Sequence, residues 1–178
     1  MITTTASTAS IPVLPRHEGA TVSDSGVELG LDDANRAGVY FVTGEDIGTL
    51  DMAARDAGLL VRRIDLRDCG SKATLLLRMS TALDFPAGGG RNWDALSDRL
   101  RDLDWLPAPG YALLFEDAAD MRDASEADFD TLLELLDEAV RDWAQRDTPF
   151  WAFLALPDSD FGQDGVPVDS SAPSPASN

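Results

Sequence analysis

Two aspartates one helical turn apart are the residues of this chain whose types and spacing best suit chemistry. Asp94 and Asp98 lie in residues 88–107, GGGRNWDALSDRLRDLDWLP, a stretch without lysine, histidine or cysteine. At a spacing of i and i+4, both carboxylates face the same side of a helix. Such a pair can act as general acid and base, bind a metal ion, face solvent, or meet the cations of another protein.

Catalysis and metal binding find little support in the residues around this pair. A hydrolase also needs a cleft and substrate-binding groups, and no histidine lies near the two carboxylates. His17 and Cys69 are single residues without a matching catalytic partner. Residues 158–165, DSDFGQDG, alternate oxygen ligands but depart from the EF-hand pattern at its fifth and sixth positions. We therefore expect no catalytic residues, no metal and no cofactor.

The two aspartates require a short amphipathic helix to hold them. Asn92 is the expected N-cap of this helix. The apolar residues at helical spacing predict a buried stripe of Trp93, Leu96, Leu100 and Leu103. Asp94 and Asp98 lie opposite that stripe, so a plain solvated helix face remains the simplest alternative to a function.

The wider pattern alternates apolar runs with helical periods. The runs predict strands at residues 38–42, 59–66, 110–117 and 149–156. Helical spacing predicts helices over residues 43–58, 71–86, 92–103 and 127–146. Strands that are apolar almost throughout are typical of parallel sheets covered on both faces. We expect an α/β domain with a small, mostly parallel sheet of three to four strands flanked by helices.

Composition divides the chain and limits its partners. Residues 1–37 are expected to form a flexible arm, residues 38–156 the folded domain, and residues 157–178 a flexible tail. The formal charge of −18 argues against direct binding to nucleic acid or an anionic membrane and favours a basic partner. A lone cysteine and the lack of a long apolar segment or signal pattern predict a cytoplasmic protein, of undefined oligomeric state.

The central segment resembles a known family. Residues 85–107 are similar to the core of barstar-type ribonuclease inhibitors, where a proline-containing turn and a glycine precede an Asn-x-Asp-Ala-Leu-x-Asp helix, here NWDALSD at 92–98. The order of elements from residue 59 to 156 is similar as well. Residues 38–58 form an extra strand-helix unit that resembles the N-terminal extension of longer actinobacterial members.

The resemblance implies a fold and a function. It implies a small parallel sheet flanked by helices, and an inhibitor or immunity protein that plugs the active site of a basic, guanyl-preferring microbial ribonuclease. Asp98 corresponds to the aspartate that enters the phosphate-binding subsite. The partner-binding residues implied are Asp94, Asp98, Glu138, Asn92, Gly90 and Ser97.

The chain departs from the family pattern at the expected contact surface. Gly88 and Gly89 replace aromatic residues of the loop before the helix, and Ser97 stands where the prototype has tryptophan. Interface energy concentrates in buried aromatic and arginine residues. The alternative is therefore a barstar-fold interaction module that no longer inhibits a nuclease.

Overall fold

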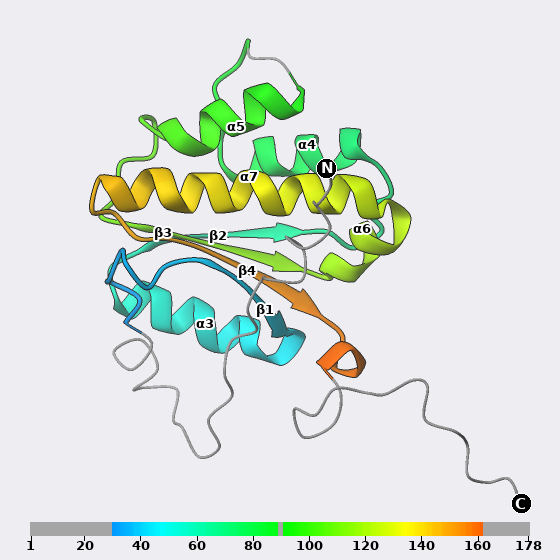
Figure 1. Cartoon of the computed structure of the whole chain (residues 1–178), viewed down its shortest axis with the longest axis horizontal. Helices are drawn as coiled ribbons and strands as arrows, with labels where there is room; N and C mark the ends of the chain where they lie inside the picture. The colour runs from blue at the N-terminus through cyan, green and yellow to red at the C-terminus, as the bar shows by residue number, and fades with distance from the viewer. Residues whose placement is uncertain (1–29, 89–90, 162–178) are drawn as a thin grey trace, which may run out of the picture.

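A four-stranded parallel sheet forms the centre of the protein (Figure 1). The computed structural model describes residues 30–88 and 91–161. The strands are β1 (Val39–Thr43), β2 (Leu60–Asp65), β3 (Tyr111–Glu116) and β4 (Phe150–Leu156). Their spatial order is β1-β4-β3-β2, and every neighbouring pair is parallel. The predicted α/β fold is confirmed, and its sheet has four strands.

Helices cover both faces of this sheet. They are α3 (Gly44–Asp56), α4 (Lys72–Ala82), α5 (Trp93–Asp102), α6 (Ala118–Ala124), α7 (Glu126–Gln145) and the 3-10 turn η1 (Asp158–Phe161). Helix α3 lies on one face, and α4 to α7 lie on the other (Figure 1). The short α6 and η1 were not among the elements predicted from the sequence, because segments of seven and four residues carry no recognisable helical period.

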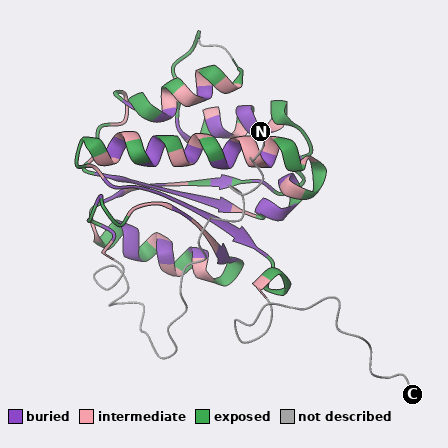
Figure 2. Cartoon of the chain, viewed as in Figure 1, coloured by how far each residue is buried: buried purple, intermediate pink, exposed green. Residues whose placement is uncertain are grey.

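The sheet separates two hydrophobic clusters. On the α3 side, Ile47 and Leu50 pack with Leu114, Trp151 and Phe153. On the other side, the alternate residues of β3 and β4 pack against the apolar faces of α4, α5 and α7. Every residue of β4 is buried, as Figure 2 shows for the central strands. Burial on both faces explains why β3 and β4 are apolar almost throughout.

Part of the expected N-terminal arm packs on the sheet. Leu31 is fully buried, and its carbonyl oxygen accepts a hydrogen bond of 2.8 Å from Trp151 Nε1. The expected arm at residues 1–29 and the expected tail from residue 162 lie outside the described residues. No helix in the described part of the chain is both long and apolar enough to cross a bilayer.

Candidate partner-binding face

The helix that carries the two aspartates is α5, and its N-terminus is fixed by a cap. Asn92 Oδ1 accepts a hydrogen bond of 2.8 Å from the backbone N–H of Ala95, which confirms the predicted N-cap. Leu96 and Leu100 are buried beneath the helix. The cap satisfies one of the N–H groups that a helix start leaves without a partner. Burial of the leucines fixes which side of α5 faces solvent.

Asp94 and Asp98 lie on that solvent side. Asp94 is exposed, and the Asp98 side chain is 78% exposed. Arg101 Nη2 lies 3.5 Å from Asp98 Oδ1, one turn along the same helix. Exposed ion pairs of this length contribute about 0 to 1 kcal/mol, so Asp98 remains available to a partner. Within the described residues, Asp94 forms no ion pair.

Two side chains of α7 bind the C-terminal end of α5. Trp143 Nε1 donates a hydrogen bond of 2.8 Å to the carbonyl oxygen of Leu100, and this bond is buried. Arg146, the residue that ends α7, donates from Nη2 to the carbonyl oxygen of Arg101 at 2.5 Å. The last carbonyls of a helix lack partners within the helix. Helix α7 supplies these partners and thereby fixes the position of α5.

Glu138 is exposed on α7, away from any hydrogen bond or ion pair with a described residue. Asp142, one turn further along α7, pairs with Arg146, and Arg146 in turn donates to a carbonyl oxygen of α5. The i, i+4 spacing of Asp142 and Arg146 is visible in the sequence. Sequence reasoning missed Asp142 because only the packing of the two helices shows that Arg146 reaches α5.

The segment that contains α5 matches a known protein family. The family model described as Barstar (barnase inhibitor) matches residues 59–155, which includes α5 and the supporting part of α7. The chain belongs to the barstar family. A search of curated proteins gives no match. Strand β1 and helix α3 precede the matched region, yet β1 pairs with β4 in the same sheet.

The loop before α5 contains both Phe85 and Gly88. Gly88 has φ of +89°, a conformation that other residues rarely adopt, and a Cβ there would meet nothing within 4 Å. The positive φ explains why glycine suits this position, because a side chain would meet no steric obstacle there. Gly89 and the expected contact Gly90 lie outside the described residues. Ser97 is half-buried, and its carbonyl oxygen lies 3.4 Å from Arg101 Nε.

A small hollow lies beside this loop. It has a volume of about 130 Å³ and lies between α4 and the start of α5. Arg99 Nη1 donates to the carbonyl oxygen of Pro86 at 3.1 Å, and its guanidinium lies 5.3 Å from the centre of the Phe85 ring. Arg99 therefore attaches the loop to α5 rather than facing outward as a free cation.

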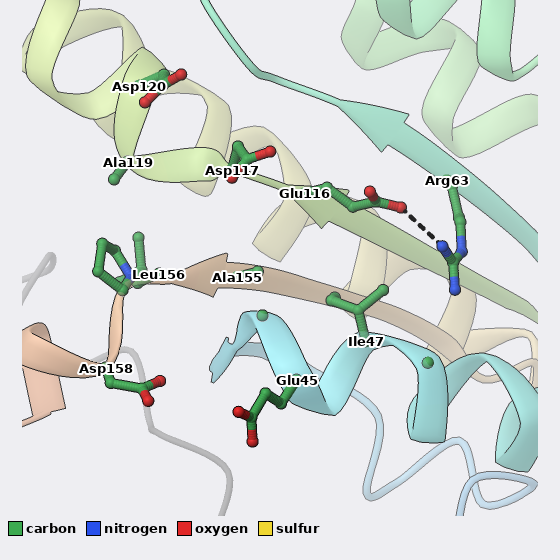
Figure 3. Close-up of a pocket in the computed structure, with 13 residues that line it drawn as sticks. Glu45, Ile47, Arg63, Glu116, Asp117, Ala119, Asp120, Ala155, Leu156 and Asp158 are labelled. Carbon is green, nitrogen blue, oxygen red and sulfur yellow. Dashed lines mark hydrogen bonds and ion pairs between the residues drawn. The ribbon is translucent and has the colours of Figure 1, made fainter.

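A second, larger pocket of about 650 Å³ lies at the carboxyl ends of the strands (Figure 3). Ile47, Ala155 and Leu156 contribute apolar lining, and acidic residues surround them. Figure 3 shows Glu116 and Arg63 pointing toward each other, with 3.0 Å between Glu116 Oε2 and Arg63 Nη1. The pocket is therefore acidic, but part of its charge is neutralised by the chain itself.

Other acidic residues of this pocket are also engaged. Asp120 Oδ2 accepts a hydrogen bond of 2.7 Å from the backbone N–H of Asp68. Asp117 Oδ2 lies 3.4 Å from Arg67 Nε, a contact that raises the pKa of Arg67. No grouping of three or more His, Cys, Asp or Glu side chains suited to a metal ion occurs among residues 30–88 and 91–161.

Proposed function

We propose that this protein is a cytoplasmic inhibitor or immunity protein that binds a basic, guanyl-preferring microbial ribonuclease and blocks its active site. One observation carries the proposal. Asp94 and Asp98 are exposed on a helix whose two ends are both fixed, in the segment that belongs to the barstar family. A rigid, acidic surface is suited to a cationic site on another protein.

The chemistry of the proposed complex follows from what the nuclease must bind. A ribonuclease active site holds RNA phosphate with arginine and lysine side chains. A carboxylate can accept the same charge-assisted hydrogen bonds in place of the phosphate. We assign this role to Asp98, with Asp94 beside it on the same face of α5. The long contact between Asp98 and Arg101 is weak enough for a nuclease cation to replace it.

The rest of the proposed interface surrounds these two carboxylates. Asn92 and Ser97 belong to α5 and its cap, and Gly90 precedes the cap in the sequence. Glu138 adds negative charge on α7. Because α5 is already fixed to α7, little conformational entropy is lost when it binds. No step of this function involves turnover, so we propose a protein that is not an enzyme.

Inhibition of a panel of microbial guanyl-preferring ribonucleases tests this proposal. The full chain is titrated against each nuclease, and cleavage of a fluorescent RNA substrate is measured. We expect stoichiometric inhibition of at least one nuclease and none of an acidic ribonuclease of another class, which serves as the control. Inhibition of no guanyl-preferring nuclease contradicts the proposal.

The second candidate function is an interaction module that retains the barstar fold without inhibiting a nuclease. Gly88 and Ser97 favour it, because neither offers the aromatic surface on which interface energy concentrates. The same panel separates the two functions. Weak binding without inhibition, measured by calorimetry on the same nucleases, supports the module.

A further inference from the structure

We propose that Arg146 is a positioning residue, which sets the orientation of α5 and thereby the place of Asp98 in the partner-binding face. This inference rests on the proposed function for its effect on a nuclease. Its structural basis is a set of contacts in the free protein. Arg146 is the C-cap residue of α7, yet its guanidinium reaches α5.

The guanidinium of Arg146 makes three contacts at once. It donates to the carbonyl oxygen of Arg101, it pairs with Asp142, and its centre lies 3.7 Å from the centre of the Trp143 ring. A planar guanidinium can stack on an aromatic ring while its edges donate hydrogen bonds. Asp142 and Trp143 thus orient Arg146, and Arg146 in turn binds α5.

Arg146 meets the C-terminal turn of α5. Helix α5 has ten residues, a length at which an isolated helix is marginal in water. Its last carbonyls need partners from outside the helix. A positive charge beside them is also favourable, because the helix C-terminus carries partial negative charge. Loss of Arg146 removes the donor to the Arg101 carbonyl oxygen and one of the positive charges beside the last turn, while Trp143 keeps its bond to Leu100.

The last turn of α5 is adjacent to Asp98. Arg101 lies three residues after Asp98, and its side chain contacts both the Asp98 carboxylate and the Ser97 carbonyl oxygen. Fraying of the last turn therefore loosens the backbone of α5 next to Asp98. A carboxylate held less precisely gives weaker charge-assisted hydrogen bonds to a partner.

Three variants test the inference. Arg146→Ala removes the side chain beyond Cβ, whereas Arg146→Met keeps an apolar stem over Trp143 and removes the guanidinium with its charge and its donors. Arg141→Ala is the matched control, because it changes the charge by the same amount and breaks another Arg–Asp pair on α7, that with Asp137. The thermal unfolding of each variant is measured first.

The first measurement is amide hydrogen exchange in the free protein. We expect faster exchange at residues 100–103 in both Arg146 variants, while exchange in the sheet and in the Arg141→Ala control stays as in the parent. This measurement needs no nuclease. Unchanged exchange at residues 100–103 in Arg146→Met overturns the inference even if the proposed function is correct.

The second measurement is binding to an inhibited nuclease. Dissociation should be roughly 3- to 30-fold faster for both Arg146 variants, which lies within the range that interaction energies between contacting residues produce. Association should be slightly faster for the Arg146 variants and for Arg141→Ala alike, because each adds net negative charge. If Arg146 had a merely structural role, its loss would lower the stability of the protein without a large increase in the dissociation rate beside a small increase in the association rate.

The outcomes separate the inference from the proposed function. Faster exchange together with unchanged dissociation contradicts the role of Arg146 in binding. Failure of the parent chain to inhibit any nuclease contradicts the proposed function, and hydrogen exchange still decides whether Arg146 fixes α5. In the Arg146→Ala background, Asp98→Ala should weaken binding less than in the parent, because the two substitutions disturb one arrangement.

Discussion

Two acidic regions of this protein differ in how many of their carboxylates have partners within the chain. At the pocket beside the strand ends, Glu116 pairs with Arg63, which also pairs with Asp51 of α3, and Asp120 accepts a hydrogen bond from a backbone N–H. On α5 and α7, the Asp94 and Glu138 carboxylates form no ion pair with a described residue. The first region supplies most of its own partners. In the second region Asp98, Asp137 and Asp142 pair with arginines of the chain, whereas Asp94 and Glu138 stay available to cations from elsewhere.

This difference shows that net charge alone does not locate a binding surface. The charge of −18 includes carboxylates of both regions. A paired carboxylate supports the fold, and its loss leaves a donor or a cation without its partner. An unpaired carboxylate on a solvent-facing helix adds little to stability. Substitutions in the pocket should therefore affect folding, and substitutions on α5 should affect binding.

The largest effect is expected for Asp98→Ala on binding to an inhibited nuclease. Truncating one member of a desolvated, hydrogen-bonded charge pair between proteins weakens binding by about 2 to 5 kcal/mol, a range drawn in part from the barstar prototype. Most of this loss should appear as faster dissociation, measured by surface plasmon resonance at several salt concentrations.

The matched control for Asp98→Ala is Glu45→Ala in the pocket. Glu45 is also exposed and lies in the first turn of a helix, and it points away from Arg63 and Glu116 (Figure 3). We expect an unchanged dissociation rate for Glu45→Ala. If Asp98→Ala dissociates at the parental rate, Asp98 does not contact the nuclease.

The sheet and the helix that carries the aspartates were open to prediction from sequence. Strands β3 and β4 are apolar at nearly every position, and this pattern is typical of parallel strands covered on both faces. The alternation of Leu96 and Leu100 with Asp94 and Asp98 defined both faces of α5. These features depend on local periodicity alone, so a single sequence is enough to predict them.

Contacts between distant elements could not be predicted in the same way. The burial of Leu31 depends on Trp151, a residue 120 positions away. The contact of Arg146 with α5 depends on how α7 packs against it, whereas the sequence shows only an Asp–Arg spacing within α7. The placement of β1 beside β4 likewise results from a crossover of the chain, which strand periodicity does not specify.

The next effect in size concerns stability in the pocket region. Arg63 Nε lies 2.9 Å from Asp51, and its Nη1 lies 3.0 Å from Glu116. Arg63→Ala leaves both carboxylates without this cation, although the arginine is 45% exposed. We expect a loss of roughly 0.5 to 1.5 kcal/mol in the free energy of unfolding, measured in urea.

Arg55→Ala is the control for the Arg63 network. Among the described residues Arg55 pairs with Asp51 alone, and its side chain is 62% exposed. Its loss should change the free energy of unfolding by less than Arg63→Ala does. Equal effects of the two substitutions would contradict the view that Arg63 neutralises two carboxylates at once. Neither substitution should alter dissociation from a nuclease.

A smaller effect is expected on the rate of association. Asp120→Asn removes a charge from the pocket region but keeps an oxygen that can accept the N–H of Asp68. Because the charge lies outside the proposed contact, only long-range attraction should weaken. We expect association to slow by about 1.5- to 2-fold at low ionic strength and to match the parent at high salt. A change in the dissociation rate would place Asp120 in the interface instead.

The smallest expected effect concerns the like charges of Asp102 and Asp104 near the end of α5. A hydrogen bond to Asp102, together with repulsion from its charge, raises the pKa of Asp104 above its usual value. The folded state therefore holds the Asp104 proton more tightly than the unfolded chain does, and this contribution to stability is lost as the pH rises through the raised pKa. At neutral pH the two carboxylates repel each other.

Asp104→Asn should remove that repulsion. We expect a slightly higher Tm than the parent at neutral pH, and a difference that disappears at acidic pH, where Asp104 of the parent is protonated. Thermal unfolding across this pH range measures the difference. Glu134→Gln is the control, since Glu134 is exposed on α7 and forms no ion pair with a described residue. A gain that persists at acidic pH would show that charge repulsion is not its cause. A gain restricted to neutral pH would show that repulsion between Asp102 and Asp104 persists even though Arg146 lies close enough to lower the pKa of Asp104.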